Sequence, residues 1–173
     1  IPVSNDLTVC EGQSVPSFTA TGANVVWYSN SILTTQVGTG NTFSSGQTSS
    51  GTYTYYVVQT NTVTGCQSLA DTTNLTINSL PSIPVSNDLT VCEGQSVPSF
   101  TATGANVVWY SNSILTTQVG TGNTFSSGQT SSGTYNYYVV QTNTVTGCQS
   151  LSDTVALFIN ALPSIPVVND IAV

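Results

Sequence analysis

Apolar residues occur along this chain in short runs, and no stretch shows the 3.6-residue spacing of an amphipathic helix. The apolar set is dominated by β-branched and aromatic side chains, which favour strands, and Gly, Asn and Ser separate the runs. The pattern predicts seven strands in the first half of the chain, at residues 7–10, 15–21, 24–28, 32–37, 41–44, 53–60 and 68–77. Seven short strands of this kind predict an all-β fold, an antiparallel β-sandwich.

The whole pattern then recurs with a period of 82 residues. Residues 83–164 repeat residues 1–82 with six differences, which leaves 82 − 6 = 76 identical positions, and residues 165–173 begin a third copy. A period of this length suits a small independent domain better than a solenoid unit. We therefore predict beads on a string, with one domain at 1–82, a second at 83–164 and the truncated first strand of a third at 165–173. Two prolines within residues 80–84 predict a stiff join.

The charge of the chain limits the classes of molecule that it can bind. The chain has seven acidic residues and no Lys, Arg or His, and only 4% of its residues are charged. Without cations it cannot neutralise the phosphates of a nucleic acid or bind an anionic membrane surface by charge. Catalysis by His or Lys and metal sites with His ligands are also excluded. No run of 18 apolar residues is present, so we expect no membrane span.

Several short motifs resemble immunoglobulin domains. Glu11-Gly12-Gln13 followed by Trp27-Tyr28 is similar to their second and third strands, and Ser50-Gly51-Thr52-Tyr53 is similar to their sixth. The resemblance implies a core signature of one buried Trp, a tyrosine-corner Tyr and a second core Tyr in each repeat: Trp27, Tyr53 and Tyr55, then Trp109, Tyr135 and Tyr137. The chain departs from the immunoglobulin pattern because the usual inter-sheet cysteines are missing.

Its cysteines lie elsewhere, in Cys-x-Gly near the start of each repeat and Gly-Cys-x-Ser near its end. With Ala-Thr-Gly-Ala and Tyr-Tyr-Val-Val between them, this arrangement resembles a bacterial Ig-like family. The family occurs in very large, repetitive surface proteins of Bacteroidetes, often with type IX secretion or gliding-associated C-terminal domains. The resemblance covers both repeats and implies an extracellular adhesin or filament at the cell surface, with no ligand named.

The four cysteines, Cys10, Cys66, Cys92 and Cys148, allow three pairings. Two cysteines in each independent bead favour Cys10–Cys66 and Cys92–Cys148, and buried free thiols are the alternative. In a standard immunoglobulin topology, however, the end of the first strand and the turn before the last strand lie at opposite poles. A bond within a repeat therefore requires that last hairpin to turn early. The spacing does not match a zinc site.

The carboxylates do not form a catalytic pattern. A glycosidase needs two of them across one cleft, and nothing in the sequence groups Asp6, Glu11 and Asp71, so we expect no enzyme activity. Asp6, Asp88 and Asp170 lie near the joins and are weak candidates for calcium binding. Because Ca²⁺ needs six to eight oxygen ligands, an Asx turn is the competing interpretation, and no cofactor is otherwise implied.

Surface modification and aromatic contacts are further candidates. Thr72 and Thr154 match the Asp-Ser/Thr-apolar O-glycosylation pattern of Bacteroidetes, an expectation from the resemblance alone. The tyrosines could form a sugar-stacking platform, but Tyr55 and Tyr56 point to opposite faces of one strand, which favours a core role for Tyr55. Phe158 replaces Thr76 on the outward face of the last strand. A lone outward Phe predicts contact with a neighbouring bead or another chain.

These features predict a stalk or filament segment of a large secreted adhesin, giving reach and stiffness for attachment or gliding motility. One alternative is a glycan-binding module that uses loops at one pole. Another is a fibre subunit assembled by strand exchange, since an A-strand segment stands at both ends of the chain. The expected partners are neighbouring repeats and other copies in a fibre, with the surface glycan or substratum left open.

Overall fold

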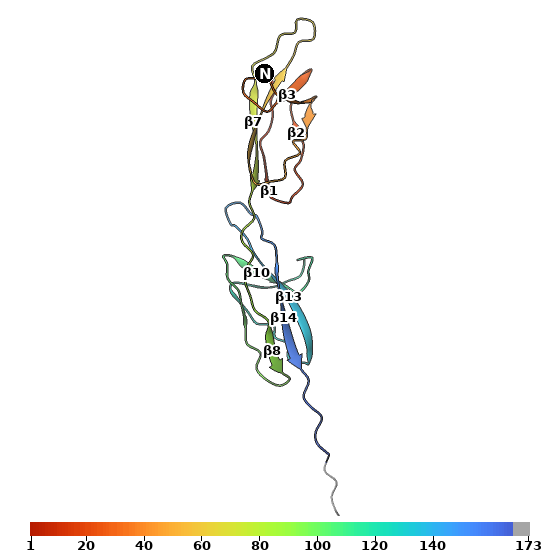
Figure 1. Cartoon of the computed structure of the whole chain (residues 1–173), viewed down its shortest axis with the longest axis vertical. Coiled ribbons are helices and arrows are strands. Elements are labelled where there is room, and N and C mark those ends of the chain that lie inside the picture. The colour runs from red at the N-terminus through yellow and green to blue at the C-terminus, as the bar shows by residue number, and fades with distance from the viewer. Residues whose placement is uncertain (168–173) are drawn as a thin grey trace, which may run out of the picture. The chain divides into compact units, whose positions relative to one another are not determined.

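Strands make up all the regular structure in the part of the chain that is described. The structure is a computed structural model that describes residues 1–167, and no helix occurs among them. The chain divides into two compact units, Ile1–Leu80 and Pro81–Val173 (Figure 1). This arrangement confirms the predicted all-β class and places the division two residues before the predicted boundary.

Each unit contains the expected seven strands. In the first unit they are β1 (Leu7–Cys10), β2 (Phe18–Thr19), β3 (Val25–Tyr28), β4 (Gln36–Thr39), β5 (Thr42–Phe43), β6 (Gly51–Gln59) and β7 (Asp71–Asn78). In the second they are β8 (Leu89–Cys92), β9 (Phe100–Thr101), β10 (Val107–Tyr110), β11 (Gln118–Thr121), β12 (Thr124–Phe125), β13 (Gly133–Gln141) and β14 (Asp153–Asn160).

The strands form a five-stranded sheet, in the order β1-β7-β6-β3-β4, and a two-stranded sheet of β2 and β5. The second unit repeats this order with β8 to β14, and Figure 1 shows β8, β14 and β13 running together there. β6 and β7 are antiparallel, whereas β1 runs parallel to β7 with Leu7 opposite Leu75 and Cys10 opposite Asn78. β1 and β7 therefore end at the same edge of the unit.

Five of the seven predicted strands are shorter than expected, and local chemistry explains two of them. Pro16 has no N–H to donate to a ladder, so pairing in the region predicted at 15–21 begins only at Phe18. In the region predicted at 32–37, the Asn30 side-chain oxygen accepts the N–H groups of Thr34 and Thr35 at 3.0 and 3.1 Å. This Asn-centred turn delays the start of β4 to Gln36.

Four aromatic rings from four strands form the centre of each core. In the first unit Trp27 stacks on Phe43 with 5.4 Å between ring centroids, and Tyr55 meets Phe18 edge-on at 5.4 Å. The Trp27 indole N–H donates to the Gly40 carbonyl at 2.8 Å, which satisfies its one polar atom inside the core. Gly38 is required beside this cluster because a Cβ there would lie 2.7 Å from Phe43 Cδ2.

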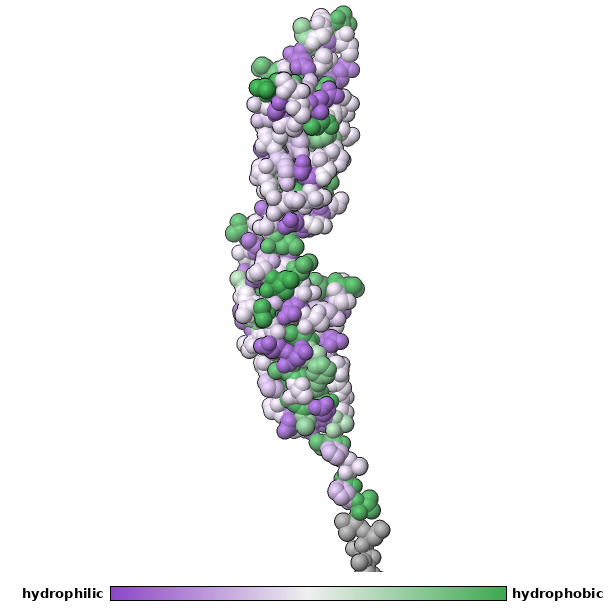
Figure 2. All heavy atoms as spheres, in the orientation of Figure 1, coloured by the Kyte–Doolittle hydropathy of each residue, from purple (hydrophilic) through white to green (hydrophobic). Residues whose placement is uncertain are grey.

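The outer surface of both units is weakly polar. On the face drawn in Figure 2 the first unit is mostly near white or pale purple, whereas the second unit shows more apolar residues among the weakly polar ones. This matches a sequence in which Ser, Thr, Asn, Gln and Gly take the places that charged residues usually occupy on a surface.

Candidate functional site: the two poles of each repeat

The chain enters each sandwich at one end and leaves it at the other. We call the first end the N-pole: it holds residues 1–4 and the β6–β7 loop at 60–70. The N-terminal segment is fixed there because the Ser4 N–H and hydroxyl both donate to Asp71 Oδ2, at 2.8 and 2.7 Å. The opposite end, where β1 stops at Cys10 and β7 stops at Asn78, is the C-pole.

Asp71, at the N-pole of the first repeat, has a shifted pKa. Burial alone raises the pKa of Asp71. Hydrogen bonds from the Ser4 hydroxyl, the Ser4 N–H and the Thr72 N–H outweigh that effect, so the pKa lies below its usual value. In the second repeat the Ser86 N–H donates to Asp153 Oδ2 at 2.9 Å, which repeats the backbone half of the contact. These contacts depend on the register between residues 1–4 and β7, so the spacing of Ser and Asp in the sequence did not reveal them.

The predicted disulfides within each repeat are wrong. Cys66 and Cys92 carry free thiols, and both are exposed. The physical reason is the parallel pairing of β1 with β7. Cys10 lies beside Asn78 at the C-pole, whereas Cys66 precedes the start of β7 and lies at the N-pole. The last hairpin does not turn early, so the opposite-pole arrangement of a standard immunoglobulin topology holds here.

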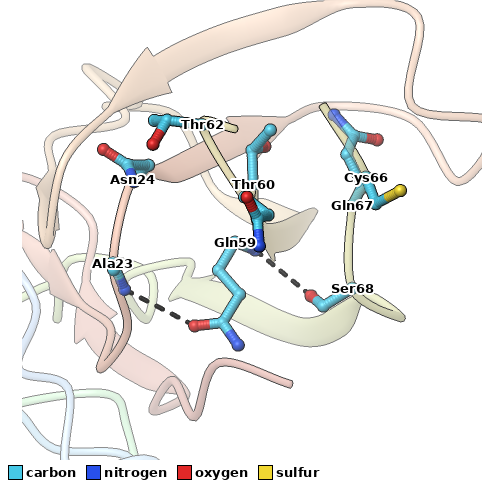
Figure 3. A pocket seen from close by; sticks show the side chains of 9 residues that line it. Ala23, Asn24, Gln59, Thr60, Thr62, Cys66, Gln67 and Ser68 are labelled. Atoms are coloured by element: carbon cyan, nitrogen blue, oxygen red, sulfur yellow. Dashed lines mark hydrogen bonds between the residues drawn. The ribbon is translucent and has the colours of Figure 1, made fainter. Parts of the chain in front are cut away.

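A polar hollow of about 500 Å³ lies at the N-pole of the first repeat. Its wall includes Asn24, Gln59, Thr60, Cys66 and Ser68. Gln59 ends β6, Asn24 precedes β3, and the other three lie in the β6–β7 loop. Figure 3 shows the Gln59 side chain reaching across it, with Oε1 accepting the Ala23 N–H and the Gln59 N–H donating to Ser68 Oγ at 3.2 Å. No periodicity in the sequence singled out Gln59.

The equivalent hollow of the second repeat is smaller, about 220 Å³, and Pro81 forms part of its wall. Gln141, the counterpart of Gln59, donates from Nε2 to the Ser82 carbonyl at 2.5 Å and to Ser82 Oγ at 2.9 Å. Its Oε1 accepts the Ala105 N–H at 2.8 Å. The N-pole of the second repeat therefore holds the Pro81-Ser82 segment through which the chain arrives.

The calcium candidates are tied to the backbone of the neighbouring strand. Asp6 Oδ1 accepts the Asn74 N–H at 2.8 Å, and Asp88 Oδ1 accepts the Ala156 N–H at 2.8 Å. Asp170 lies outside the described residues. Within residues 1–167, no group of three or more His, Cys, Asp or Glu side chains is placed to hold a metal ion. Glu11 Oε1 lies 3.4 Å from the Ser50 N–H, which donates to it.

The core-signature residues lie in and beside the aromatic centre. Trp27, Tyr55 and their counterparts Trp109 and Tyr137 are buried. Tyr53 is half-buried, and its hydroxyl donates to the Ser49 carbonyl at 3.0 Å, the bond that defines a tyrosine corner. Tyr135 makes the same bond to Ser131 at 3.1 Å. Because these tyrosines fill the core or support its corner, they do not form an exposed platform.

The remaining candidates lie on the outside of the last strand of each repeat. Thr72 and Thr154 are exposed near the start of β7 and β14. Phe158 points outward from β14 and is 37% exposed, while its neighbours Leu157 and Ile159 are buried. A hydroxyl acceptor and an apolar contact are thus both accessible on this strand.

Comparison with known proteins gives one family match. A profile described as "Ig-like domain CHU_C associated" matches residues 1–79 and again residues 81–160. Comparison with curated proteins gives no match. No helix among the described residues has the length and apolar character needed to cross a membrane.

Several solved structures are similar in fold. The fibronectin(III)-like modules of CbhA from Clostridium thermocellum are 14% identical, with a TM-score of 0.46 and coverage of 98% of this chain and 100% of that one. The tandem Ig repeats of Dlar are 18% identical, with a TM-score of 0.35 and coverage of 93% and 98%. Human mucin-like protocadherin EC1-2 is 10% identical, with a TM-score of 0.37 and coverage of 95% and 99%. With TM-scores below 0.5, these likenesses say nothing of ligand or function.

Proposed function

Because the chain belongs to the Ig-like, CHU_C-associated family, we propose that it is a stalk segment of a large, repetitive protein exported to the cell surface. In this role the repeats supply reach and stiffness to an adhesin used for attachment or gliding. Recognition of the surface is left to other parts of the protein. Ig-like and fibronectin-like repeats of this kind are typical extracellular modules.

The observation that carries the proposal is the separation of the two poles. The first repeat receives its chain at the N-pole, beside the start of β7, and releases it at the C-pole, where β7 ends. An eight-residue strand spans roughly 26 Å. Each repeat therefore separates the entry of its chain from the exit by about that distance, whereas a module with both termini at one pole adds little reach.

The hydrogen bonds at the N-pole support stiffness. Ser82 is held by Gln141, and Ser86 is held by Asp153, so the segments on both sides of Pro84 are fixed to the second sandwich. Proline restricts the rest of the join because its ring fixes φ.

Near-identity of the repeats fits a structural role better than recognition. The two copies differ at six positions, two of which lie on the half-exposed or exposed side of the last strand. The surface carries no cations, and its scarce carboxylates are spread over both poles. It offers no concentrated charge with which to select a ligand.

The proposal is tested by varying repeat number. Proteins with two, four and six copies of the 82-residue unit are imaged by electron microscopy, and one repeat pair is screened on a glycan array. We expect end-to-end length to rise by the same increment for each added repeat and no glycan to bind specifically. A length that fails to rise with repeat number, or a saturable and specific glycan signal, overturns the stalk assignment in favour of a binding module.

A further inference from the structure

Both repeats carry a glutamine at the end of their sixth strand, Gln59 in β6 and Gln141 in β13. In each repeat the side-chain oxygen Oε1 accepts a backbone N–H from the loop before the third strand, that of Ala23 at 3.4 Å and that of Ala105 at 2.8 Å. Because Oε1 makes this bond, the Nε2 amide group is left to donate to another partner. The two N-poles therefore present the same hydrogen-bond donor at the same position.

A glycine in the same loop lets the glutamine lie there. A Cβ at Gly22 would lie 2.9 Å from Gln59 Oε1, and a Cβ at Gly104 would lie 2.6 Å from Gln141 Oε1. Both distances are too short for a real side chain, so only glycine leaves room for the amide group at this point of the loop. The place of the glutamine is therefore built into each sandwich.

In the second unit, which begins at Pro81, Gln141 uses its Nε2 group to bind the segment with which that unit starts. Nε2 donates to the Ser82 carbonyl at 2.5 Å and to Ser82 Oγ at 2.9 Å. The adjacent Pro81 is half-buried and forms part of the wall of the hollow, whose volume is about 220 Å³. This pole therefore binds a Pro-Ser segment through one amide group and a proline ring.

The corresponding hollow of the first unit is larger, about 500 Å³. Its wall includes residues 23–24 and 59–62, which correspond to residues 105–106 and 141–144 in the wall of the second hollow. Among residues 1–167, no group accepts a hydrogen bond from Nε2 of Gln59. The first unit thus has both the volume and the donor that a Pro-Ser segment requires.

The chain contains such a segment a second time. Residues 162–166 repeat residues 80–84 as Leu-Pro-Ser-Ile-Pro. Pro163 and Ser164 are both exposed, and neither makes a hydrogen bond to a described residue, whereas Pro81 is half-buried. The Ser164 carbonyl and hydroxyl and the Pro163 ring are therefore accessible to another molecule.

The first residues of the chain limit how far a bound segment can extend. Pro2 is buried, and the Ser4 hydroxyl donates to Asp71, so both residues are fixed at the N-pole. Ile1 is exposed. A segment bound beside Gln59 can therefore reach as far as its serine and must then turn away from the pole. Binding of this kind requires no exchange of a strand.

We propose that the hollow beside Gln59 is a binding site for an extended Pro-Ser segment, and that it binds Pro163-Ser164 of a second copy of the chain. Gln59 Nε2 donates to the Ser164 carbonyl and Oγ, and the Pro163 ring packs against the wall. These are the contacts that Gln141 and its hollow make with residues 81–82. Because the site and the segment are different surfaces, the contact joins copies head to tail. The inference goes beyond the stalk assignment, which requires no contact between copies.

Self-association of the full two-repeat chain tests the proposal, in reductant so that no disulfide forms between copies. Gln59→Glu keeps an oxygen for the Ala23 N–H and removes the Nε2 donor. We expect sedimentation equilibrium to give a dissociation constant at least about fivefold higher than that of the unmutated chain, because a hydrogen bond is lost and a carboxylate faces the Ser164 carbonyl. Gln141→Glu adds the same charge beside residues 81–82, and as the matched control it should leave the constant unchanged.

Substitutions in the segment itself give an independent variant, because exposed residues outside the strands can be changed without disturbing either sandwich. Pro163→Gly/Ser164→Gly should weaken self-association by a similar factor. A synthetic peptide of residues 161–167, added to the isotope-labelled chain, should shift the NMR signal of the Gln59 side-chain amide and leave that of Gln141 in place. The same peptide with both glycine substitutions should shift neither signal.

Self-association that is equally strong in the Gln59→Glu variant overturns the proposal, as does a chain that stays monomeric at millimolar concentration. A peptide that leaves the Gln59 signal in place, or shifts the Gln141 signal as much, overturns it too. None of these outcomes affects how end-to-end length rises with repeat number, so failure of this proposal and failure of the stalk assignment are distinguishable.

Discussion

At the scale of single residues, polar contacts decide where the chain is held. The Ser4–Asp71 contact joins residues 67 positions apart, and it ties the incoming segment to the first residue of β7. The Gln141 side chain likewise holds Ser82 at the start of the second repeat, by donating to the Ser82 carbonyl. Neither pair forms part of a recognisable motif, because such contacts arise only once the strand register has placed the partners together.

The lowered pKa of Asp71 predicts acid sensitivity at the N-pole. A carboxyl with a lowered pKa in the folded state stabilises that state at neutral pH, and the contribution is lost as the pH falls through the lowered value. We expect Asp71→Asn to reduce the free energy of unfolding by about 1 kcal/mol at pH 7. The difference from the unmutated chain should shrink below about pH 4, where the free carboxyl of an unfolded chain is protonated.

Urea denaturation at pH 7 and pH 3 measures this effect. Thr72→Ala is the matched control, because the Thr72 side chain is exposed and its backbone N–H remains. An Asp71→Asn effect of equal size at both pH values would show that the charge of Asp71 contributes nothing.

At the scale of strands, alternation predicted the fold well. Residues 73, 75 and 77 of β7 are buried, and the residues between them are at least partly exposed, so the two-residue period reports the core face. The alternation does not show at which residue the pairing of a strand with its neighbour begins or ends. The strands predicted to begin at Val15 and Ile32 are shorter in the structure, because Pro16 and the Asn30 turn interrupt pairing without changing the hydrophobic pattern.

The cysteine pairing was missed for a related reason. Spacing along the chain says that Cys10 and Cys66 belong to one domain, but only the parallel pairing of β1 with β7 shows that they lie at opposite poles. The tandem period, by contrast, was visible in the sequence at once because 76 of 82 positions are identical.

Two substitutions in the last strand of the second repeat test which of its side chains face the core. Phe158 is 37% exposed, and replacing it with the Thr of the first repeat should change the free energy of unfolding by less than about 1 kcal/mol. Leu157→Ala, one residue away in the buried face, should cost about 2–5 kcal/mol. Denaturant titration of both variants measures this contrast. A Phe158→Thr loss as large as that of Leu157→Ala would place Phe158 in the core.

At the scale of the whole chain, the free thiols predict directional assembly. Cys66 lies at the N-pole of the first repeat and Cys92 at the C-pole of the second, so Cys92 of one copy can bond Cys66 of the next. Oxidation of the concentrated protein should give a ladder of covalent multimers on a non-reducing gel. Cys66→Ser or Cys92→Ser alone should stop the ladder at dimers, and a ladder that persists in either variant would exclude this linkage.

Stretching the reduced two-repeat chain between its ends by single-molecule force spectroscopy tests the account most directly. We expect two unfolding steps, each releasing roughly 250 Å, the extended length of about 80 residues less its folded span. A single step of about twice that length, or extension without steps, would contradict the view that this is a stalk of independently folded repeats.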